Sequence, residues 1–341
     1  MTFNELYAIF AERRKWLVKI GTNGTYLSRW RSVAPLVGER PAEEFTMADA
    51  DAVKRALLAR GMQASTVKNR LNLLRVLLKF GASELGLDVV PPVWPLRWPV
   101  EPPHTVRCYD STELTRLVAV LLDELAQGRQ AGALPALVAV TAGLRIGEVC
   151  ALRWSDINLQ RRTITIGATL IEIPFPEAGG IDEPAAQGGA TITPGDGGPA
   201  RRLAIVPPKT RSGYRVIPLV GLLAKVLRKL DAQRRRKQTS DPADFLLSGT
   251  EQPREPRSVS RSFARLLERR GLPELNFHGL RHTYATHLVD SGGDIKTISA
   301  ILGHADVTTT MNLYVHPSLD SRRRVASRAF SRLSRAKVRI K

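Results

Sequence analysis

The sequence predicts a mainly helical protein of two domains, the second of which also carries a small antiparallel β-sheet. Three observations predict this fold class. Apolar residues recur at helical spacing through most of residues 1–90, a proline-rich segment interrupts the chain at residues 91–103, and short β-prone segments lie within residues 163–217 before helical periodicity returns. The length of 341 residues also favours two domains, because single cores rarely keep growing through this size range.

Helices are expected throughout the first domain, residues 1–90. The apolar periodicity predicts them over residues 3–18, 25–36 and 48–60, with a fourth from Ser65 onward. In the fourth helix we expect the hydroxyl of Ser65 to cap the N terminus, and the apolar residues from Val67 to Leu78 recur at the spacing of one buried stripe. This pattern is the clearest helical signal in the domain.

The fourth helix also has a basic face, formed by Lys68, Arg75 and Lys79. On a single helix such a face is usually only solvated. The whole chain, however, has 51 Lys and Arg against 32 Asp and Glu, and the formal charge of +19 indicates a polyanionic partner. No apolar run approaches the roughly 20 residues that span a bilayer, so we expect no membrane and predict nucleic acid as the partner. We therefore predict that these three side chains contact DNA phosphates.

Two further features bear on the compartment. Residues 1–20 scatter charged side chains among the apolar ones, which leaves no hydrophobic stretch for a signal peptide. Cys108 and Cys150 form neither a disulfide framework nor a zinc motif. We therefore predict a cytoplasmic protein.

The second domain, residues 104–341, follows a predicted interdomain linker, because six prolines within residues 91–103 preclude a continuing helix. Asp110 and Glu113 have the spacing of a capping box, which predicts a helix that runs to about Gln127 and ends at Gly128. A second helix is expected over residues 134–142, and helices return from Val259 onward.

A single small antiparallel sheet is expected between these helical parts, from strands over residues 163–166, 169–173, 203–206 and 214–217. The last two strands bracket a Lys-Thr-Arg-Ser-Gly turn at residues 209–213. Residues 174–200 are rich in Gly, Pro and Ala, which predicts a flexible insertion. The tail, residues 320–341, is strongly basic and is compatible with either an assembly helix or a DNA-binding arm.

Two segments place cationic and nucleophilic residues where an ordinary helix does not need them. In the first, Arg145 follows a glycine-interrupted helix end, so we expect its guanidinium to leave a rigid turn. Taken alone, this segment favours a surface arginine near a helix C terminus. In the second, His278 and Arg281 lie three residues apart and would face the same direction on a helix. Tyr314 lies near the end of a short helical stretch that begins at Thr308.

Three motifs in this order resemble the tyrosine recombinase, or phage integrase, family over residues 105–316: AGLRIGE (142–148), HGLRHTYATHL (278–288) and LGHADVTTTMNLY (302–314). The N-terminal helices are similar to the family's core-binding domain. The resemblance implies an α+β catalytic domain in which Arg145 and Arg281 clamp the scissile phosphate, His278 and His304 accompany them, and Tyr314 is the nucleophile. The turn at residues 208–213 resembles the family hairpin that carries a catalytic lysine, so Lys209 inherits that role, with Arg211 as the neighbour that could be confused with it.

These residue types suit the implied chemistry. Guanidinium forks neutralise charge on phosphate oxygens with a bidentate geometry that lysine lacks. A phosphotyrosine conserves the bond energy, so resealing needs no ATP, and a lysine near arginines is a suitable proton donor. A histidine could take the tyrosine proton or hold phosphate oxygens. We expect Glu148 to orient a neighbouring group rather than to perform chemistry.

The resemblance implies a site-specific recombinase that cleaves and rejoins double-stranded DNA through a 3′-phosphotyrosine intermediate, with no metal and no cofactor. Its implied state is a homotetramer on paired recombination sites and a monomer or dimer in solution, associated with the bacterial nucleoid. Two alternatives remain at this point. A type IB topoisomerase uses the same chemistry as a monomer, and a catalytically silent DNA-binding protein could retain the fold.

Overall fold

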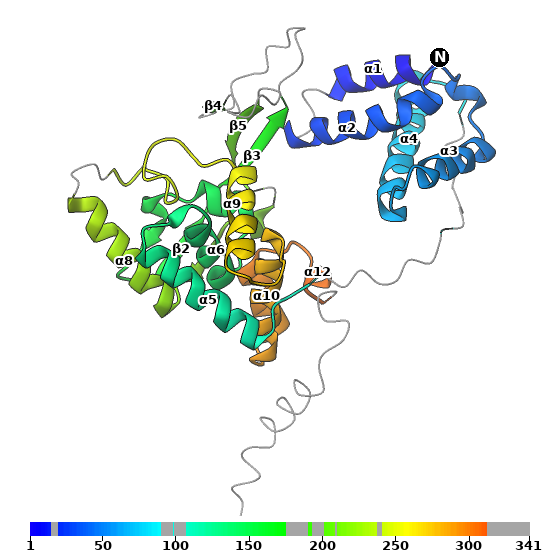
Figure 1. Cartoon of the computed structure of the whole chain (residues 1–341). Coiled ribbons are helices and arrows are strands. Elements are labelled where there is room, and N and C mark those ends of the chain that lie inside the picture. The colour runs from blue at the N-terminus through cyan, green and yellow to red at the C-terminus, as the bar shows by residue number, and fades with distance from the viewer. Residues whose placement is uncertain are drawn as a thin grey trace, which may run out of the picture. The chain divides into compact units, whose positions relative to one another are not determined.

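The computed structural model describes residues 1–14, 20–89, 98, 107–174, 190–192, 201–208, 210–236 and 241–311. The chain divides into two compact units, Met1–Thr105 and Val106–Lys341 (Figure 1). The elements are mainly helices, and the second unit also carries antiparallel strands, so the predicted fold class is confirmed. Within the described ranges, no helix combines the length and the apolar character needed to cross a membrane.

The first unit packs its helices around α4, which contacts the other three α-helices. The predicted apolar stripe of α4 is buried at Val67, Leu71, Leu74 and Leu78 and forms the centre of the core of this unit. The helices of the unit, blue to cyan in Figure 1, are α1 (Phe3–Arg14), α2 (Ile20–Val37), a short 3₁₀ helix (Ala42–Glu44), α3 (Met47–Ala59) and α4 (Ala64–Leu85).

The N terminus of α4 differs from the prediction. Its capping residue is Gln63, which makes no side-chain cap, and Ser65 already lies inside the first turn. The reason is packing, because Ala64 is buried and the first turn therefore belongs to the core. Residues 15–18 of the first predicted helix lie outside the described residues, and so does the predicted linker apart from Trp98.

The second unit is built around α6, which contacts α5, α9 and α10, as Figure 1 shows. Nearly every residue of α6 is buried, so this helix is the centre of the larger core. The α-helices of the unit are α5 (Ser111–Ala126), α6 (Gln130–Ala142), α7 (Ile146–Ala151), α8 (Gly221–Arg236), α9 (Pro256–Arg269), α10 (Phe277–Asp290), α11 (Ile295–Leu302) and α12 (Val307–Met311).

The first helix of this unit begins as predicted. The carboxylate of Asp110 accepts hydrogen bonds from the backbone of Thr112 and Glu113, and the Glu113 side chain accepts one from the backbone of Asp110, which completes the capping box. The second helix, α6, begins earlier than predicted, at Gln130. The added first turn includes Gly132, where a Cβ would lie 2.7 Å from the Ser262 carbonyl oxygen, so this turn packs closely against α9. Helix α8 was not predicted from the sequence.

The strands form two three-stranded antiparallel sheets, ordered β1-β2-β6 and β3-β5-β4. The prediction of one sheet was therefore wrong, and the two strands that flank the turn at residues 209–213 pair with different partners. Gly167 and Ala168 separate β2 from β3, so the chain changes sheets between them. The strands are β1 (Ile157–Asn158), β2 (Thr163–Ile166), β3 (Thr169–Pro174), β4 (Ala190–Ile192), β5 (Arg201–Val206) and β6 (Arg215–Pro218).

Strand β4 lies inside the predicted flexible insertion, residues 174–200. Its three residues pair antiparallel with β5, in a register that places Ala190 opposite Leu203 and Ile192 opposite Arg201. Three residues of the predicted insertion are therefore in a strand, because pairing with a strand edge uses backbone groups and does not require apolar periodicity. Residues 175–189 and 193–200 of the insertion lie outside the described residues, as does the basic tail, residues 320–341.

Candidate active site

Arg145 lies at a tight turn between two helices. Helix α6 ends at Ala142, Gly143 follows with a φ of +67°, and Arg145 is the N-terminal capping residue of α7. A Cβ on Gly143 would lie 2.4 Å from the ring of Tyr284, so only glycine allows both this turn and the close packing against α10. The rigid turn predicted at this position is present.

Glu148 fixes one edge of the Arg145 guanidinium. The Glu148 carboxylate accepts a hydrogen bond from Arg145 Nη1 at 3.0 Å and one from the Arg145 backbone nitrogen at 2.9 Å. The Arg145 side chain nevertheless remains 41% exposed. An arginine has five N–H donors, so the other donors of Arg145 remain available to an anion.

Arg281, on α10, connects the Arg145 turn to the end of α11. Its side chain is 4% exposed, and it donates to the carbonyl oxygens of Gly143 at 2.7 Å and of Leu302 at 2.6 Å. Burial, together with the positive charge of Arg145, lowers the pKa of Arg281 to about 9. The guanidinium is therefore still protonated at neutral pH, and two cations lie side by side.

Two histidines of the predicted site lie near these arginines. His278 lies in the first turn of α10, and His304 follows α11 after Gly303, whose φ is +69°. Desolvation and then the charges of Arg281 and Arg145 lower both pKa values, that of His304 to about 4. At neutral pH His304 is therefore a neutral imidazole, as a proton acceptor must be.

His282 lies beside His278, with ring centroids 4.6 Å apart and the rings at 83°. Desolvation, followed by the influence of His278, lowers the pKa of His282 to about 4. His287 contacts the Tyr109 carbonyl oxygen at 3.0 Å through Nε2. These contacts are typical of packing and capping histidines.

Arg215 belongs to the same cluster, although sequence reasoning missed it. This residue opens β6, and its guanidinium donates to both oxygens of Glu148, each at 3.0 Å. A signal was available in the strand pattern. Side chains alternate between the two faces of a strand, so Arg215 shares its face with the buried Ile217 while Val216 is exposed. A cation on the buried face of a strand requires a buried anion.

Lys209 and Tyr314 lie outside the described residues. The structure does describe their neighbours. A short 3₁₀ helix, Arg211–Gly213, follows Lys209, and Thr210 Oγ1 lies 2.9 Å from Ser212 Oγ. Before Tyr314, the carboxylate of Asp306 accepts from the backbone nitrogen of Thr308 at 2.8 Å at the start of α12.

The predicted DNA-contacting residues lie in the first unit. Lys68, Arg75 and Lys79 are all exposed on α4. Lys68 Nζ lies 5.0 Å from the ring centroid of Trp98. In the part of the chain that the structure describes, none of the three is in an ion pair, so their charges remain open to an external anion.

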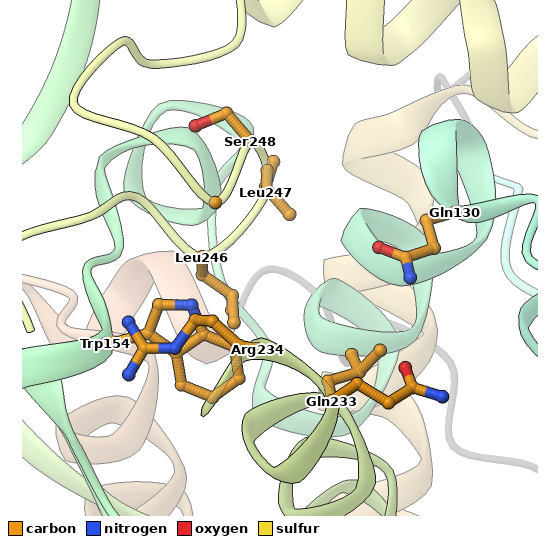
Figure 2. Close-up of a pocket in the computed structure, with 9 residues that line it drawn as sticks. Gln130, Trp154, Gln233, Arg234, Leu246, Leu247 and Ser248 are labelled. Atoms are coloured by element: carbon orange, nitrogen blue, oxygen red, sulfur yellow. The ribbon is translucent and has the colours of Figure 1, made fainter. Parts of the chain in front are cut away.

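A cavity of about 280 Å³ lies at the other end of α6, where Gln130, Trp154, Arg234 and Leu246 line it (Figure 2). Arg234 stacks on the Trp154 ring, with the guanidinium carbon 4.7 Å from the ring centroid. Gln130 and Ala142 are opposite ends of a 13-residue helix, which separates the cavity from Arg145 by roughly 18 Å at 1.5 Å per residue. This cavity is not part of the arginine cluster.

Comparisons with known proteins agree with this arrangement. Residues 199–320 match the model of the phage integrase family. A XerC-like tyrosine recombinase of Caldanaerobacter subterraneus is 27% identical over 190 residues, which are 53% of this chain and 44% of that protein, so the match spans less than half of that relative. The XerC tyrosine recombinase of Proteus mirabilis is 26% identical over 83% of this chain and 79% of its own length.

The fold also matches a solved structure. The Tn1549 transposon integrase, in complex with transposon right end DNA, superposes with a TM-score of 0.70 at 22% identity and covers 98% of this chain and 100% of that chain. At this identity the likeness shows a shared fold. The sequence matches, with the arginine and histidine cluster, identify the chain as a member of the phage integrase family of tyrosine recombinases.

Proposed function

We propose that this chain is a site-specific recombinase that cuts and rejoins double-stranded DNA through a 3′-phosphotyrosine formed by Tyr314. The observation that carries the proposal is the cluster in which Arg145 and Arg281, far apart in sequence, share Glu148 and lie near His278 and His304. Two adjacent guanidinium groups with one exposed edge match a phosphodiester, whose transition state concentrates negative charge on its nonbridging oxygens.

In the proposed reaction the phenolic oxygen of Tyr314 attacks the scissile phosphorus, and the bond from phosphorus to the 5′ oxygen breaks. A neutral histidine, His278 or His304, takes the tyrosine proton, and Lys209 gives a proton to the departing 5′ oxygen. Rejoining is the reverse reaction, with a 5′ hydroxyl as the attacking group. Since the phosphotyrosine conserves the phosphodiester bond energy, the cycle needs neither ATP nor a metal ion.

Exchange between two duplexes requires cleavage of four strands, and each chain supplies one Tyr314. We therefore infer that four copies assemble on a pair of recombination sites, while a monomer or dimer persists in solution. The DNA substrate also leads us to expect that the protein acts in the bacterial cytoplasm, at the nucleoid.

A nicked suicide substrate tests the proposal directly. Cleavage near the nick releases a short fragment and traps the protein on DNA, so a covalent adduct that resists denaturation is expected without added metal or ATP. A catalytically silent DNA-binding protein would bind this substrate and give no adduct. A type IB topoisomerase would give the adduct and would also relax supercoiled plasmids that lack any recombination site.

Lys209→Ala is expected to lower cleavage of ordinary DNA by about 10²- to 10⁴-fold, the range of a lost general acid. Cleavage should recover when sulfur replaces the bridging 5′ oxygen, because a thiolate departs without a proton. Adduct yield on the two substrates measures this. Arg211→Ala is the matched control from the same turn; recovery by sulfur in that variant, and not in Lys209→Ala, would transfer the role to Arg211.

Replacing Lys68, Arg75 and Lys79 together with glutamine is expected to weaken DNA binding and to make the plot of log affinity against log salt shallower, by about 0.9 for each phosphate that the protein no longer neutralises. Gel-shift titrations at several salt concentrations measure both quantities. Arg55→Gln is the matched control, since Arg55 is an exposed cation of the same unit that is already paired with Asp51. An unchanged slope in the triple variant would assign the three residues to solvated surface.

A further inference from the structure

The buried side chain of Arg215 connects three segments of the active site. Besides its two hydrogen bonds to Glu148, its Nε donates to the Ile301 carbonyl oxygen at 2.7 Å, and its Nη1 donates to the Gly213 carbonyl oxygen at 3.1 Å. Gly213 belongs to the turn that follows Lys209, and Ile301 lies near the end of α11, just before His304. One guanidinium thus joins the surroundings of Lys209, His304 and the arginine pair.

The position of Arg215 depends on a glycine beside His304. A Cβ on Gly303 would lie 2.8 Å from Arg215 Nη1 and 2.9 Å from the Ser212 carbonyl oxygen. Any side chain at residue 303 would therefore displace either the guanidinium or the turn that follows Lys209. The Arg215 side chain is 6% exposed, so DNA cannot take the place of its protein partners.

Glu148 is the common partner of three arginines, since Arg215, Arg145 and, at 3.9 Å, Arg281 all approach its carboxylate. Burial raises the pKa of Glu148, but the hydrogen bonds and charge of Arg215, with help from Arg145, hold it below its usual value. The carboxylate is therefore ionised at neutral pH. Three guanidinium charges and one carboxylate leave the cluster with a net charge of 3 − 1 = +2.

We propose that Arg215 is a positioning residue for strand cleavage. Arg215 neutralises Glu148, so that the charges of Arg145 and Arg281 remain available to the scissile phosphate. Without Arg215 the net charge would fall to 2 − 1 = +1, and an uncompensated carboxylate would lie beside the phosphate. The carboxylate of Glu148 would still hold Arg145, but its uncompensated negative charge would repel the DNA phosphate. This inference rests on the proposed function, because it concerns the same phosphate.

The test compares single and double variants in the full chain. Arg215→Gln should slow cleavage within the bound DNA complex by about 100-fold, an effect of the size seen when one donor of a transition-state charge is lost. The double variant Glu148→Gln with Arg215→Gln restores the net charge to +2, from Arg145 and Arg281. It should therefore cleave at least about tenfold faster than Arg215→Gln, although it carries one more substitution.

Arg234→Gln is the matched control. Arg234 is also an arginine with a largely buried side chain held by a carboxylate, at 3.1 Å from Asp231, but it lies beside the distant cavity. This variant should lose stability in urea unfolding and cleave at the wild-type rate. Arg215→Lys keeps the positive charge but loses the bidentate fork, so it should lose stability. If Arg215→Gln does not fold, Arg215→Lys should still form the adduct, within about 100-fold of the wild-type rate.

The outcomes separate the inference from the proposed function. If the wild-type protein binds its site and forms no covalent adduct, the proposed function fails. If the wild type forms the adduct, and the double variant cleaves no faster than Arg215→Gln, charge balance is overturned and Arg215 is only a structural link between β6 and α11. A folded Arg215→Lys variant that does not cleave would overturn the inference in the same way.

Discussion

Tyr314→Phe should reduce strand cleavage by on the order of 10⁴-fold or more and leave DNA affinity nearly unchanged. The substitution removes one oxygen, which is the atom proposed to bond to phosphorus, and it alters no charge that DNA could contact. The suicide substrate measures cleavage through the denaturation-resistant adduct, and a gel shift on an intact site measures binding. Both assays use the same protein preparation. If the adduct is lost and DNA binding is retained, the defect lies in the chemical step.

Tyr214→Phe is the matched control. Tyr214 is 56% exposed and directly follows the turn that carries Lys209, so it is the other tyrosine that this part of the structure offers to a phosphate. It should cleave at the wild-type rate. An adduct that persists in Tyr314→Phe and disappears in Tyr214→Phe would move the nucleophile to Tyr214 and contradict the assignment drawn from the family motif.

The local features of the site could be predicted from the sequence because each depends on a few neighbouring residues. The turn before Arg145 follows from Gly143, whose left-handed conformation ends α6, and the capping box of α5 follows from Asp110 and Glu113. His278 and Arg281 share α10, as their spacing predicted. In each case the signal and the structure lie within one turn of helix.

The contacts that assemble the site could not be predicted in this way, because they join segments distant in the sequence. Arg281 donates to the carbonyl oxygens of Gly143 and Leu302, and no local pattern specifies a backbone acceptor in another element. The predicted pairing of the strands on either side of Lys209 was wrong for the same reason. The sequence predicted that these segments are strands, but it did not predict that β6 pairs with β2 and β5 with β3. Strand pairing depends on which faces the core buries.

The sequence did not indicate that Arg215 is the main partner of Glu148. The motif around Arg145 made Glu148 visible as a structural carboxylate, and the structure places it among three arginines. One of these arginines, Arg215, lies on a strand that was predicted from β-propensity alone, without attention to the charge of Arg215. Buried charge is rarely tolerated without a partner, so an arginine on the inner face of a strand is itself a signal for a carboxylate elsewhere in the chain.

The two arginines proposed to clamp the scissile phosphate should respond differently to the same substitution. Arg145→Lys is expected to slow cleavage by about 10²- to 10³-fold, since a point charge replaces a planar fork of donors. Its side chain is 41% exposed, so the free energy of unfolding should change by less than about 1 kcal/mol. Single-turnover cleavage and urea unfolding measure the two effects.

Arg281→Lys should lose both activity and stability. Arg281 is 4% exposed and satisfies the carbonyl oxygens of Gly143 and Leu302, and a lysine has neither the reach nor the fork to donate to both. An unsatisfied buried acceptor costs about 1–3 kcal/mol, so the free energy of unfolding should fall by about that amount while cleavage falls at least as far as in Arg145→Lys. Because Arg281 supports the turn that presents Arg145, its loss acts on both cations. If Arg281→Lys were destabilised yet cleaved at the wild-type rate, Arg281 would be a structural residue, and Arg145 would have to hold the phosphate without it.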